Sequence, residues 1–315
     1  MQQSEKYLFS ITVPAFKAQY LAECIDSILT QTYSCFELII VNDASPQNLD
    51  KIISQYHDER IRYFKNEKNC GALHVVDNWN KCLSYAKGDY IICMGDDDKL
   101  HPNCLEEYVK LIEKYPGLNV YHALTEIIDE SSKFSRMQEM RPEREGVYSM
   151  IYGRLFGNRL QYIGDWLFRT DWLKEKGGYV DIPMAWGSDD LTAYNAALGK
   201  GVANSQVPMF QYRVNSQTIS NSGNTLIKFN SMMSTYKKIK ELLELKSDDD
   251  LDEKYRLTCI AKIDDKIRTI KTSAVQQDMV STGKIKGLVW WINHSSSFNI
   301  HRSEIIKAFI KSINK

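Results

Sequence analysis

Short apolar runs alternate with helical repeats along the first hundred residues of the chain. Residues 8–13, 36–41 and 90–94 are mainly apolar and predict strands. The second run is nearly all apolar, as is typical of a parallel strand that is covered on both faces. Between the first two runs, the apolar residues of 20–30 recur with the spacing of a helix. Pro14 is expected to break the first strand. Strands that alternate with helices predict an α/β fold built on an open, mostly parallel sheet.

The pattern becomes less regular after the first hundred residues. The charged stretch 133–148 is typical of a mobile loop, and residues 165–179 predict another strand followed by a helix. From about Thr225 the composition changes to lysine-rich amphipathic helices. We therefore expect a main domain over residues 1–224 and a helical C-terminal extension over 225–315.

Three consecutive carboxylates, Asp96, Asp97 and Asp98, follow the third apolar run. The carboxyl ends of parallel strands share one edge of an open sheet, where ligands bind, so this turn is expected to lie beside Pro14 and Asp43. Three like charges side by side are unfavourable unless a cation accompanies them, and hard carboxylate oxygens suit Mg²⁺ or Mn²⁺. The alternative is a solvated acidic turn that caps the next helix.

The amino-acid composition argues against several classes of function. With 40 basic and 40 acidic residues among 315, the chain has no overall field that would attract nucleic acid. It contains no glycine-rich phosphate loop of the P-loop or dinucleotide-binding type. The polar residues 1–6 predict no signal peptide, and no apolar stretch reaches the roughly 20 residues of a membrane span. Seven cysteines without a C-x-x-C pair favour reduced thiols and a cytoplasmic protein.

Four blocks of sequence follow one another in a definite order. They are residues 12–16 with 27–33; residues 36–45; residues 87–92 with the three aspartates; and Phe168-Arg169, Gly177-Gly178-Tyr179, Ser188-Asp189-Asp190 and Tyr212-Arg213. The ordered set resembles the family 2 glycosyltransferases, which are inverting enzymes of the GT-A fold. The resemblance implies a Rossmann-like, mostly parallel mixed sheet flanked by helices, with residues 1–224 as the GT-A domain and a helical extension after it.

The resemblance also implies a binding site for a nucleotide-sugar donor. Phe16, close after Pro14, would offer a flat apolar platform to the nucleobase, and Asp43 would accept a hydrogen bond from N3–H of uracil. Asp97 would be the principal ligand of Mn²⁺ or Mg²⁺, which links it to the diphosphate, and Asp96 would help to hold the metal or the ribose. From the residues alone, Phe16 could equally be a core aromatic and Asp43 a turn or N-cap residue.

A general base is implied at Asp189. An inverting transfer needs a carboxylate that takes the proton of the attacking acceptor hydroxyl, and a helix start facing the cleft suits this role. Asp190 is the rival, because one of the two adjacent residues could instead cap the helix. Gln161-Tyr162 and Asp165-Trp166 lie where an acceptor sugar could bind, although packing in the core is an equal alternative.

The chain departs from the family pattern at several positions. Lys17 stands where the family usually has asparagine, Gly95 replaces the first acid of the usual acidic run, and Trp79 replaces an arginine before Asn80. Asn215 stands where a histidine is common. These differences leave open which group contacts the diphosphate.

The function predicted from the resemblance is metal-dependent, inverting transfer of a hexosyl or N-acetylhexosaminyl group. The donor would be a nucleotide-sugar linked to UDP, and the acceptor a carbohydrate or a lipid-linked sugar. Bacterial surface polysaccharide biosynthesis is the implied setting. A sugar nucleotidyltransferase and a catalytically weak sugar-nucleotide binding module are the alternatives.

The C-terminal segment suggests a further partner. Trp290 and Trp291 lie in an apolar run flanked by basic residues such as Lys284 and Lys286. Such a run could seat the protein peripherally on the inner face of the cell membrane. The alternative is that these residues pack the C-terminal helices onto the main domain or onto a second subunit, as in a homodimer.

Overall fold

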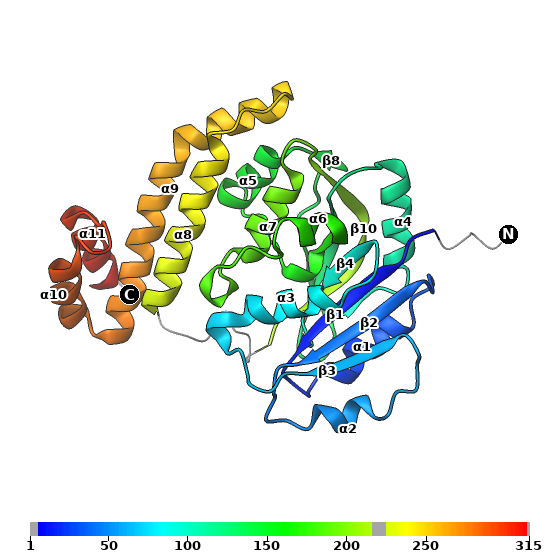
Figure 1. Cartoon of the computed structure of the whole chain (residues 1–315). Coiled ribbons are helices and arrows are strands. Elements are labelled where there is room, and N and C mark those ends of the chain that lie inside the picture. The colour runs from blue at the N-terminus through cyan, green and yellow to red at the C-terminus, as the bar shows by residue number, and fades with distance from the viewer. Residues whose placement is uncertain (1–5, 216–224, 314–315) are drawn as a thin grey trace.

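A central mixed sheet organises the chain, as the computed structural model shows for residues 6–215 and 225–313 (Figure 1). The order of its strands along the main path is β3-β2-β1-β4-β9-β6-β10-β5. The first four strands in this order are parallel, and β10 runs parallel to β6. Strand β9 is antiparallel to both of its neighbours, β4 and β6. The predicted α/β fold with a mostly parallel, mixed sheet is therefore confirmed.

The strands differ in length and position. The longest strands, β1, β2, β6 and β10, lie within the sheet, and the short strands β4 and β9 lie side by side at its centre. Their bounds are Phe9–Ala15 (β1), Phe36–Asn42 (β2), Ile61–Lys65 (β3), Tyr90–Cys93 (β4), Lys99–Leu100 (β5), Val120–Ile128 (β6), Phe134–Met137 (β7), Arg144–Glu145 (β8), Trp166–Arg169 (β9) and Val202–Arg213 (β10).

Helices cover both faces of the sheet, and the two faces have separate cores. Along β2, Leu38 and Ile40 pack with the first group of helices, whereas Ile39 and Val41 pack with the second. The first group is Leu21–Leu29 (α1), Leu49–Ile53 (α2) and Cys104–Lys114 (α4). The second group is Val75–Tyr85 (α3), Val147–Phe156 (α5), Thr170–Glu175 (α6) and Ser188–Ala197 (α7). Single 3-10 turns occur at Ala72–His74 (η1), Ile163–Asp165 (η2) and Pro183–Ala185 (η3).

Two expectations about local structure are wrong. Strand β1 continues through Pro14, which pairs with Val41 of β2. This is tolerated because β4 pairs with β1 only as far as Thr12, so on that side no N–H is required of the proline. Residues 133–148 do not form a simple loop, since they contain β7, β8 and the start of α5.

Four helices follow the sheet domain within residues 225–313. They are Thr225–Leu243 (α8), Asp250–Thr282 (α9), Lys284–His294 (α10) and Arg302–Ile313 (α11). Tyr236 and Ile263, from α8 and the first half of α9, belong to the same core cluster as α5 and α7. The end of α9 forms a separate cluster with α10 and α11. No helix among the described residues combines the length and apolarity needed to span a bilayer.

The tryptophans of α10 take part in this second cluster. Trp291 is fully buried, and its indole N–H donates a hydrogen bond of 2.8 Å to Asp278 of α9. Trp290 stacks on the ring of His294. Trp291 thus packs the C-terminal helices against one another. The boundary at residues 224/225 between domain and extension stays a prediction, because α8 and α9 share a core with the sheet domain.

Gly146 lies where the extension packs closely against the sheet domain. The side chain of Asp252, on α9, accepts a 2.8 Å hydrogen bond from the backbone N–H of Ser149 in the first turn of α5. A Cβ atom at residue 146 would lie 2.2 Å from Cγ of Asp252. We expect Gly146→Ala to lower the free energy of unfolding by about 1–3 kcal/mol in urea titrations, because the buried carboxylate must move.

A double-mutant cycle provides the control for this prediction. In an Asp252→Ala background the clash is absent, so adding Gly146→Ala should cost little. Equal costs of Gly146→Ala in both backgrounds would contradict the proposed contact.

Candidate active site

The acidic turn after β4 is bonded directly to the end of β1. One carboxylate oxygen of Asp96, Oδ2, accepts hydrogen bonds of 2.6 Å from the backbone N–H groups of Phe16 and Lys17. Next to them, the N–H of Asp43 donates to the carbonyl oxygen of Ala15 at 2.9 Å. Burial and the neighbouring charge of Asp97 raise the pKa of Asp96 to about 6. The predicted residues therefore meet at one edge of the sheet.

A cation already lies between two of the aspartates. The ammonium group of Lys17 lies 2.6 Å from Oδ2 of Asp97 and 3.9 Å from Oδ1 of Asp96. Burial lowers the pKa of Lys17, but the two carboxylates outweigh this effect and leave it raised. Asn215, where the family often has histidine, donates to the same oxygen of Asp97 at 2.7 Å.

This arrangement fits a divalent cation in part. Carboxylate oxygens converge on a positive charge, and Mg²⁺ is commonly bound through one or two carboxylates together with substrate phosphates. Within residues 6–215 and 225–313, however, no three His, Cys, Asp or Glu side chains are grouped to hold a metal by themselves. A bound ion would therefore take further ligands from the substrate and displace Lys17 from Asp97.

Gly95 is explained by the crowding of this turn. A Cβ atom at residue 95 would lie 2.8 Å from a carboxylate oxygen of both Asp97 and Asp98. An aspartate at this position, as in the usual family run, would need the two following carboxylates to move.

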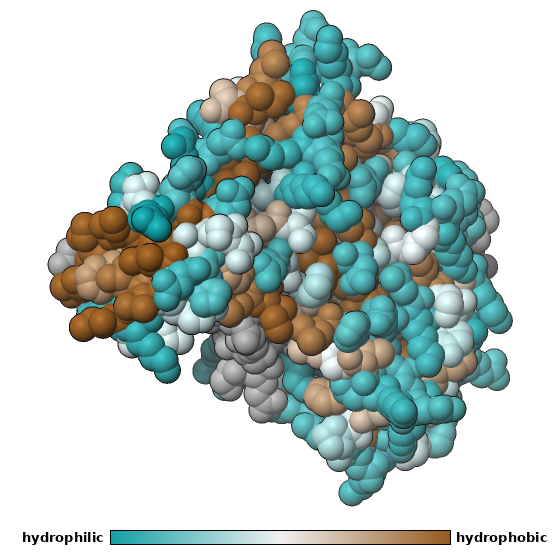
Figure 2. Space-filling view, turned by 60° about the vertical axis from the view of Figure 1, so that its left-hand side comes forward, coloured by the Kyte–Doolittle hydropathy of each residue, from teal (hydrophilic) through white to brown (hydrophobic). Residues whose placement is uncertain are grey.

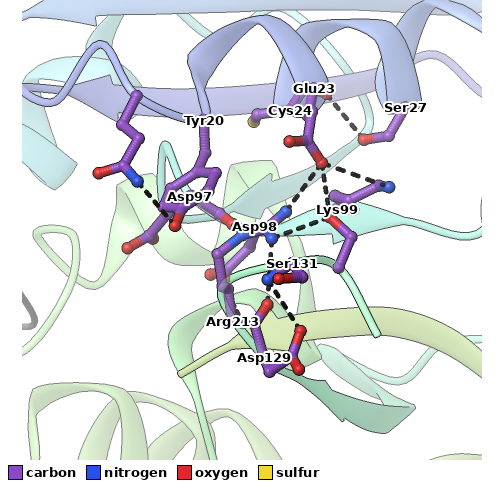
Figure 3. Close-up of polar contacts among 12 residues, drawn as sticks. Tyr20, Glu23, Cys24, Ser27, Asp97, Asp98, Lys99, Asp129, Ser131 and Arg213 are labelled. Atoms are coloured by element: carbon purple, nitrogen blue, oxygen red, sulfur yellow. Dashed lines mark hydrogen bonds and ion pairs between the residues drawn. The ribbon is translucent and has the colours of Figure 1, made fainter. Parts of the chain in front are cut away.

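Arg213, at the end of β10, holds the acidic turn from the other side (Figure 3). Its side chain is fully buried and donates from Nε to the carbonyl oxygen of Asp97 at 2.7 Å, while its backbone N–H donates to Asp98 at 2.9 Å. Burial, followed by the charge of Asp97, raises the pKa of Asp98. The guanidinium also pairs with Glu23 at 3.1 Å and lies 4.1 Å from the ring centroid of Tyr20. The position of Asp98 is therefore set by β10.

The predicted nucleobase side of the site is partly preformed. Phe16 is 39% exposed, so it is not a core aromatic. Asp43 is buried, and its carboxylate accepts hydrogen bonds from the side chain of Asn66 at 2.8 Å and from the backbone N–H of Cys70 at 3.0 Å. These bonds link Asp43 to the segment after β3, so the residue stabilises this part of the structure in addition to any role in binding. Pro14 lies within β1, one residue before its end.

Asp189 and Asp190 form the first turn of α7 and differ in their environment. Asp190 is paired with Arg154 of α5, with 3.0 Å between Oδ2 and Nε. Asp189 accepts a hydrogen bond of 2.9 Å from the backbone N–H of Asp190. Burial and the neighbouring charge of Asp190 raise the pKa of Asp189 to about 7, a value suited to a general base at neutral pH.

One cavity of about 570 Å³ connects the two groups of aspartates. Asp98 lies at its wall together with Asp189 and Asp190. Aromatic rings form much of the remainder, and those of Tyr162 and Tyr212 are stacked with their centroids 3.6 Å apart. The lining includes Trp79, Gln161, Tyr162, Trp186 and Tyr212 from the sheet domain, and Met232, Thr235, Tyr236, Ile239, Lys266 and Ile270 from α8 and α9.

The two segments predicted near the acceptor, Gln161-Tyr162 and Asp165-Trp166, lie in different surroundings. Tyr162 lines the cavity, and the buried side-chain amide of Gln161 has no hydrogen-bond partner among the described residues. Asp165 and Trp166 are fully buried and lie outside the cavity lining, so they belong to the core.

Several residues of the site were not found from the sequence. Arg154 is one of them, because its partner Asp190 lies 36 residues away, although a single arginine in an otherwise apolar stretch signals a buried partner. The contribution of α8 and α9 to the cavity has no local signal, because it depends on how these helices pack.

Comparison with known proteins identifies the family. Residues 10–176 match the family model described as Glycosyl transferase family 2. An uncharacterized glycosyltransferase of Rickettsia typhi is 32% identical over 133 residues, which cover 42% of this chain and 40% of the relative. A protein of Escherichia coli K12 described as "Putative colanic acid biosynthesis glycosyl transferase WcaA" is 38% identical over 105 residues, covering 32% and 37%. The matches thus span about two-fifths of these curated relatives or less.

Solved structures show the same fold. TarS 1–349 of Staphylococcus aureus in complex with UDP-GlcNAc aligns with 97% of this chain and 88% of TarS, at a TM-score of 0.66 and 16% identity. The mannosyltransferase PcManGT of Pyrobaculum calidifontis, in complex with GDP-Man and Mn²⁺, aligns with 98% of this chain and 87% of its own, at a TM-score of 0.57 and 15% identity. The fold is therefore GT-A-like. Because the family model covers more than half of the residues, the chain belongs to glycosyl transferase family 2.

Proposed function

We propose that the protein transfers a sugar from a UDP-sugar to a carbohydrate acceptor, with inversion at the anomeric carbon. The observation that carries the proposal is the cavity that joins Asp98, at the acidic turn, to Asp189. A donor whose diphosphate lies at the turn would place its sugar in this cavity, with a carboxylate on the opposite side to receive a proton.

The donor would be held by the edge of the sheet. In this proposal, Phe16 supports the nucleobase and Asp43, fixed by Asn66 and Cys70, accepts from uracil. Asp97, with Asp96, would hold Mn²⁺ or Mg²⁺, and such an ion, when bound, offsets the charge that develops on the departing diphosphate. Lys17, once displaced from Asp97, remains close enough to offer its ammonium group to the phosphates in place of the missing arginine.

Asp189 would be the general base and Asp190 the residue that positions it. Because Asp190 already pairs with Arg154, it fixes the first turn of α7 and keeps Asp189 at the cavity wall. The acceptor would lie on the aromatic wall formed by Tyr162, Tyr212 and Trp186, since sugar rings stack well on flat apolar surfaces.

The wider setting follows from the relatives and from the thiols. WcaA is named for colanic acid biosynthesis, and we propose a comparable part in bacterial surface polysaccharide assembly, with a carbohydrate or lipid-linked sugar as acceptor. None of the seven cysteines forms a disulfide bond in the described part of the chain, in line with a cytoplasmic location. In this proposal residues 1–224 form the GT-A domain, and the extension of residues 225–315 completes the acceptor wall.

Asp97→Ala tests the donor site directly. We expect it to lower the affinity for UDP in the presence of Mn²⁺ by about 100-fold or more, as measured by calorimetry, because the principal metal ligand is lost. The affinity measured with a chelator present should change little.

Asp171→Ala is the matched control for Asp97→Ala. It removes an exposed aspartate of α6, outside the cavity lining, and should leave the Mn²⁺-dependent affinity unchanged. An unchanged affinity in Asp97→Ala would refute the ligand assignment. Tight nucleotide binding by the wild type without turnover of any donor would instead favour the catalytically weak binding module.

A further inference from the structure

Helices α10 and α11 carry apolar side chains on two opposite faces. One face packs inward, where Trp291 of α10 and Ile305 and Ala308 of α11 are buried in the cluster at the end of α9. The other face is also apolar, but it is open to solvent. Apolar side chains gathered on a solvent-exposed helix face usually mark an interaction site, so this second face is expected to have a partner.

The uncovered face forms one patch, which we call the terminal patch. Its members are spaced three or four residues apart along each helix, and each is at least 50% exposed: Ile285, Val289, Ile306, Ile310 and Ile313. Figure 2 shows this patch as a continuous brown area at the left-hand end of the molecule, over α10 and α11. Contiguous apolar surface of this kind marks an interaction site.

Basic side chains surround the terminal patch. Between residues 284 and 313 the chain has five basic residues, Lys284, Lys286, Arg302, Lys307 and Lys311, and one acidic residue, Glu304. Glu304 is buried and accepts a hydrogen bond from the backbone N–H of His301. The positive charge is local, because the chain as a whole has 40 basic and 40 acidic residues.

An apolar patch with a basic rim allows a choice between two partners, a second copy of the chain and a membrane. In a two-fold dimer the patch would meet a copy of itself, so the basic rim would face an identical basic rim and be repelled. A membrane surface that contains anionic lipid instead offers apolar chains to the isoleucines and negative headgroups to the lysines. Charge complementarity thus favours the membrane.

We propose that α10 and α11 dock the protein on the surface of an anionic bilayer through the terminal patch. The patch residues enter the boundary between headgroups and acyl chains, and Lys284, Lys286, Arg302, Lys307 and Lys311 contact the headgroups. The cavity lies a short distance away, because ten residues of α9, about 15 Å, separate the lining residue Ile270 from Val280 near the patch. The docking does not depend on the proposed sugar transfer.

Vesicle flotation of the full chain tests this docking. The wild type should float with vesicles of phosphatidylcholine and phosphatidylglycerol, bind phosphatidylcholine alone more weakly, and be released from the anionic vesicles by salt. Lys307→Glu/Lys311→Glu should lower the partition coefficient by about 25-fold or more, since each lysine contributes about fivefold near an anionic surface. Ile310→Asp should lower it by about tenfold.

Matched controls lie on the first half of α9. Leu257→Asp and Lys254→Glu change exposed side chains of the same kinds outside the patch, and should leave flotation unchanged. All variants should keep the melting temperature of the wild type, because the altered side chains are exposed. A wild type that fails to float with anionic vesicles overturns the proposal. A dimer in light scattering that Ile310→Asp disperses, without vesicle binding, overturns it too and assigns the patch to a second copy.

Discussion

Replacing Asp189 by asparagine is expected to lower the rate of sugar transfer by about 10²- to 10⁴-fold, the usual contribution of a general base. The amide keeps the size of the side chain but cannot accept the proton of the acceptor hydroxyl. Donor binding should be preserved, because in the proposed site the nucleotide is held by Phe16, Asp43 and Asp97 and not by Asp189, which lies at the cavity wall. Transfer assays together with UDP calorimetry measure the two effects separately.

Asp190→Asn is the matched control for this substitution. Asp190 is already paired with Arg154, so its loss should disturb the first turn of α7 and reduce transfer less than Asp189→Asn does. The opposite order of the two effects would move the catalytic role to Asp190.

The pH dependence provides a second readout of Asp189. With a pKa of about 7, the carboxyl group is largely protonated below neutrality, so kcat/KM of the wild type should rise with pH up to about 7 and then level off. The pKa is raised above its ordinary value of 3.8, so the folded chain holds this proton more tightly than the unfolded chain. The stability from this group is therefore present below the ordinary value and is lost as the pH rises towards 7. Asp189→Asn should melt higher than the wild type at pH 8, and this gain should shrink at lower pH.

The strands around the donor site could be predicted because each one is marked by an apolar run within its own sequence. In β2, every residue is buried, so the apolar run in the sequence is the direct result of helices on both faces. The acidic turn could be placed beside Asp43 for a similar reason, since carboxyl ends of parallel strands share an edge. The roles of individual residues in donor binding, metal binding and catalysis stay predictions, because neither the structure nor the relatives test them.

The contacts that shape the site could not be predicted, because they join distant parts of the chain. Lys17 meets Asp97 across 80 residues, and Arg154 meets Asp190 across 36. Strand β10 was missed for another reason. It is interrupted by polar residues and by Pro208, and its pairing with β6 shifts register on both sides of that proline.

Arg213→Met is expected to lower the free energy of unfolding by about 3 kcal/mol, the largest stability effect that we predict. The guanidinium is fully buried and donates to the carbonyl oxygens of Asp97 and Asp129. The bond to Asp97 is buried, so its carbonyl oxygen would be left without this donor in a site with little access to water. The backbone bond from residue 213 to Asp98 would remain, so the variant isolates the side chain. Urea titration measures the change.

Arg169→Met shows whether burial is the cause of that effect. Arg169 also binds an aspartate, Asp171, with 2.6 Å between Nε and Oδ1, but a third of its side chain is exposed. Water can replace the lost partner there, so the cost should stay below about 1 kcal/mol. If both substitutions cost the same, the side chain of Arg213 contributes no more than a surface pair, and the acidic turn is held by its other bonds, from the backbone of Phe16, Lys17 and residue 213.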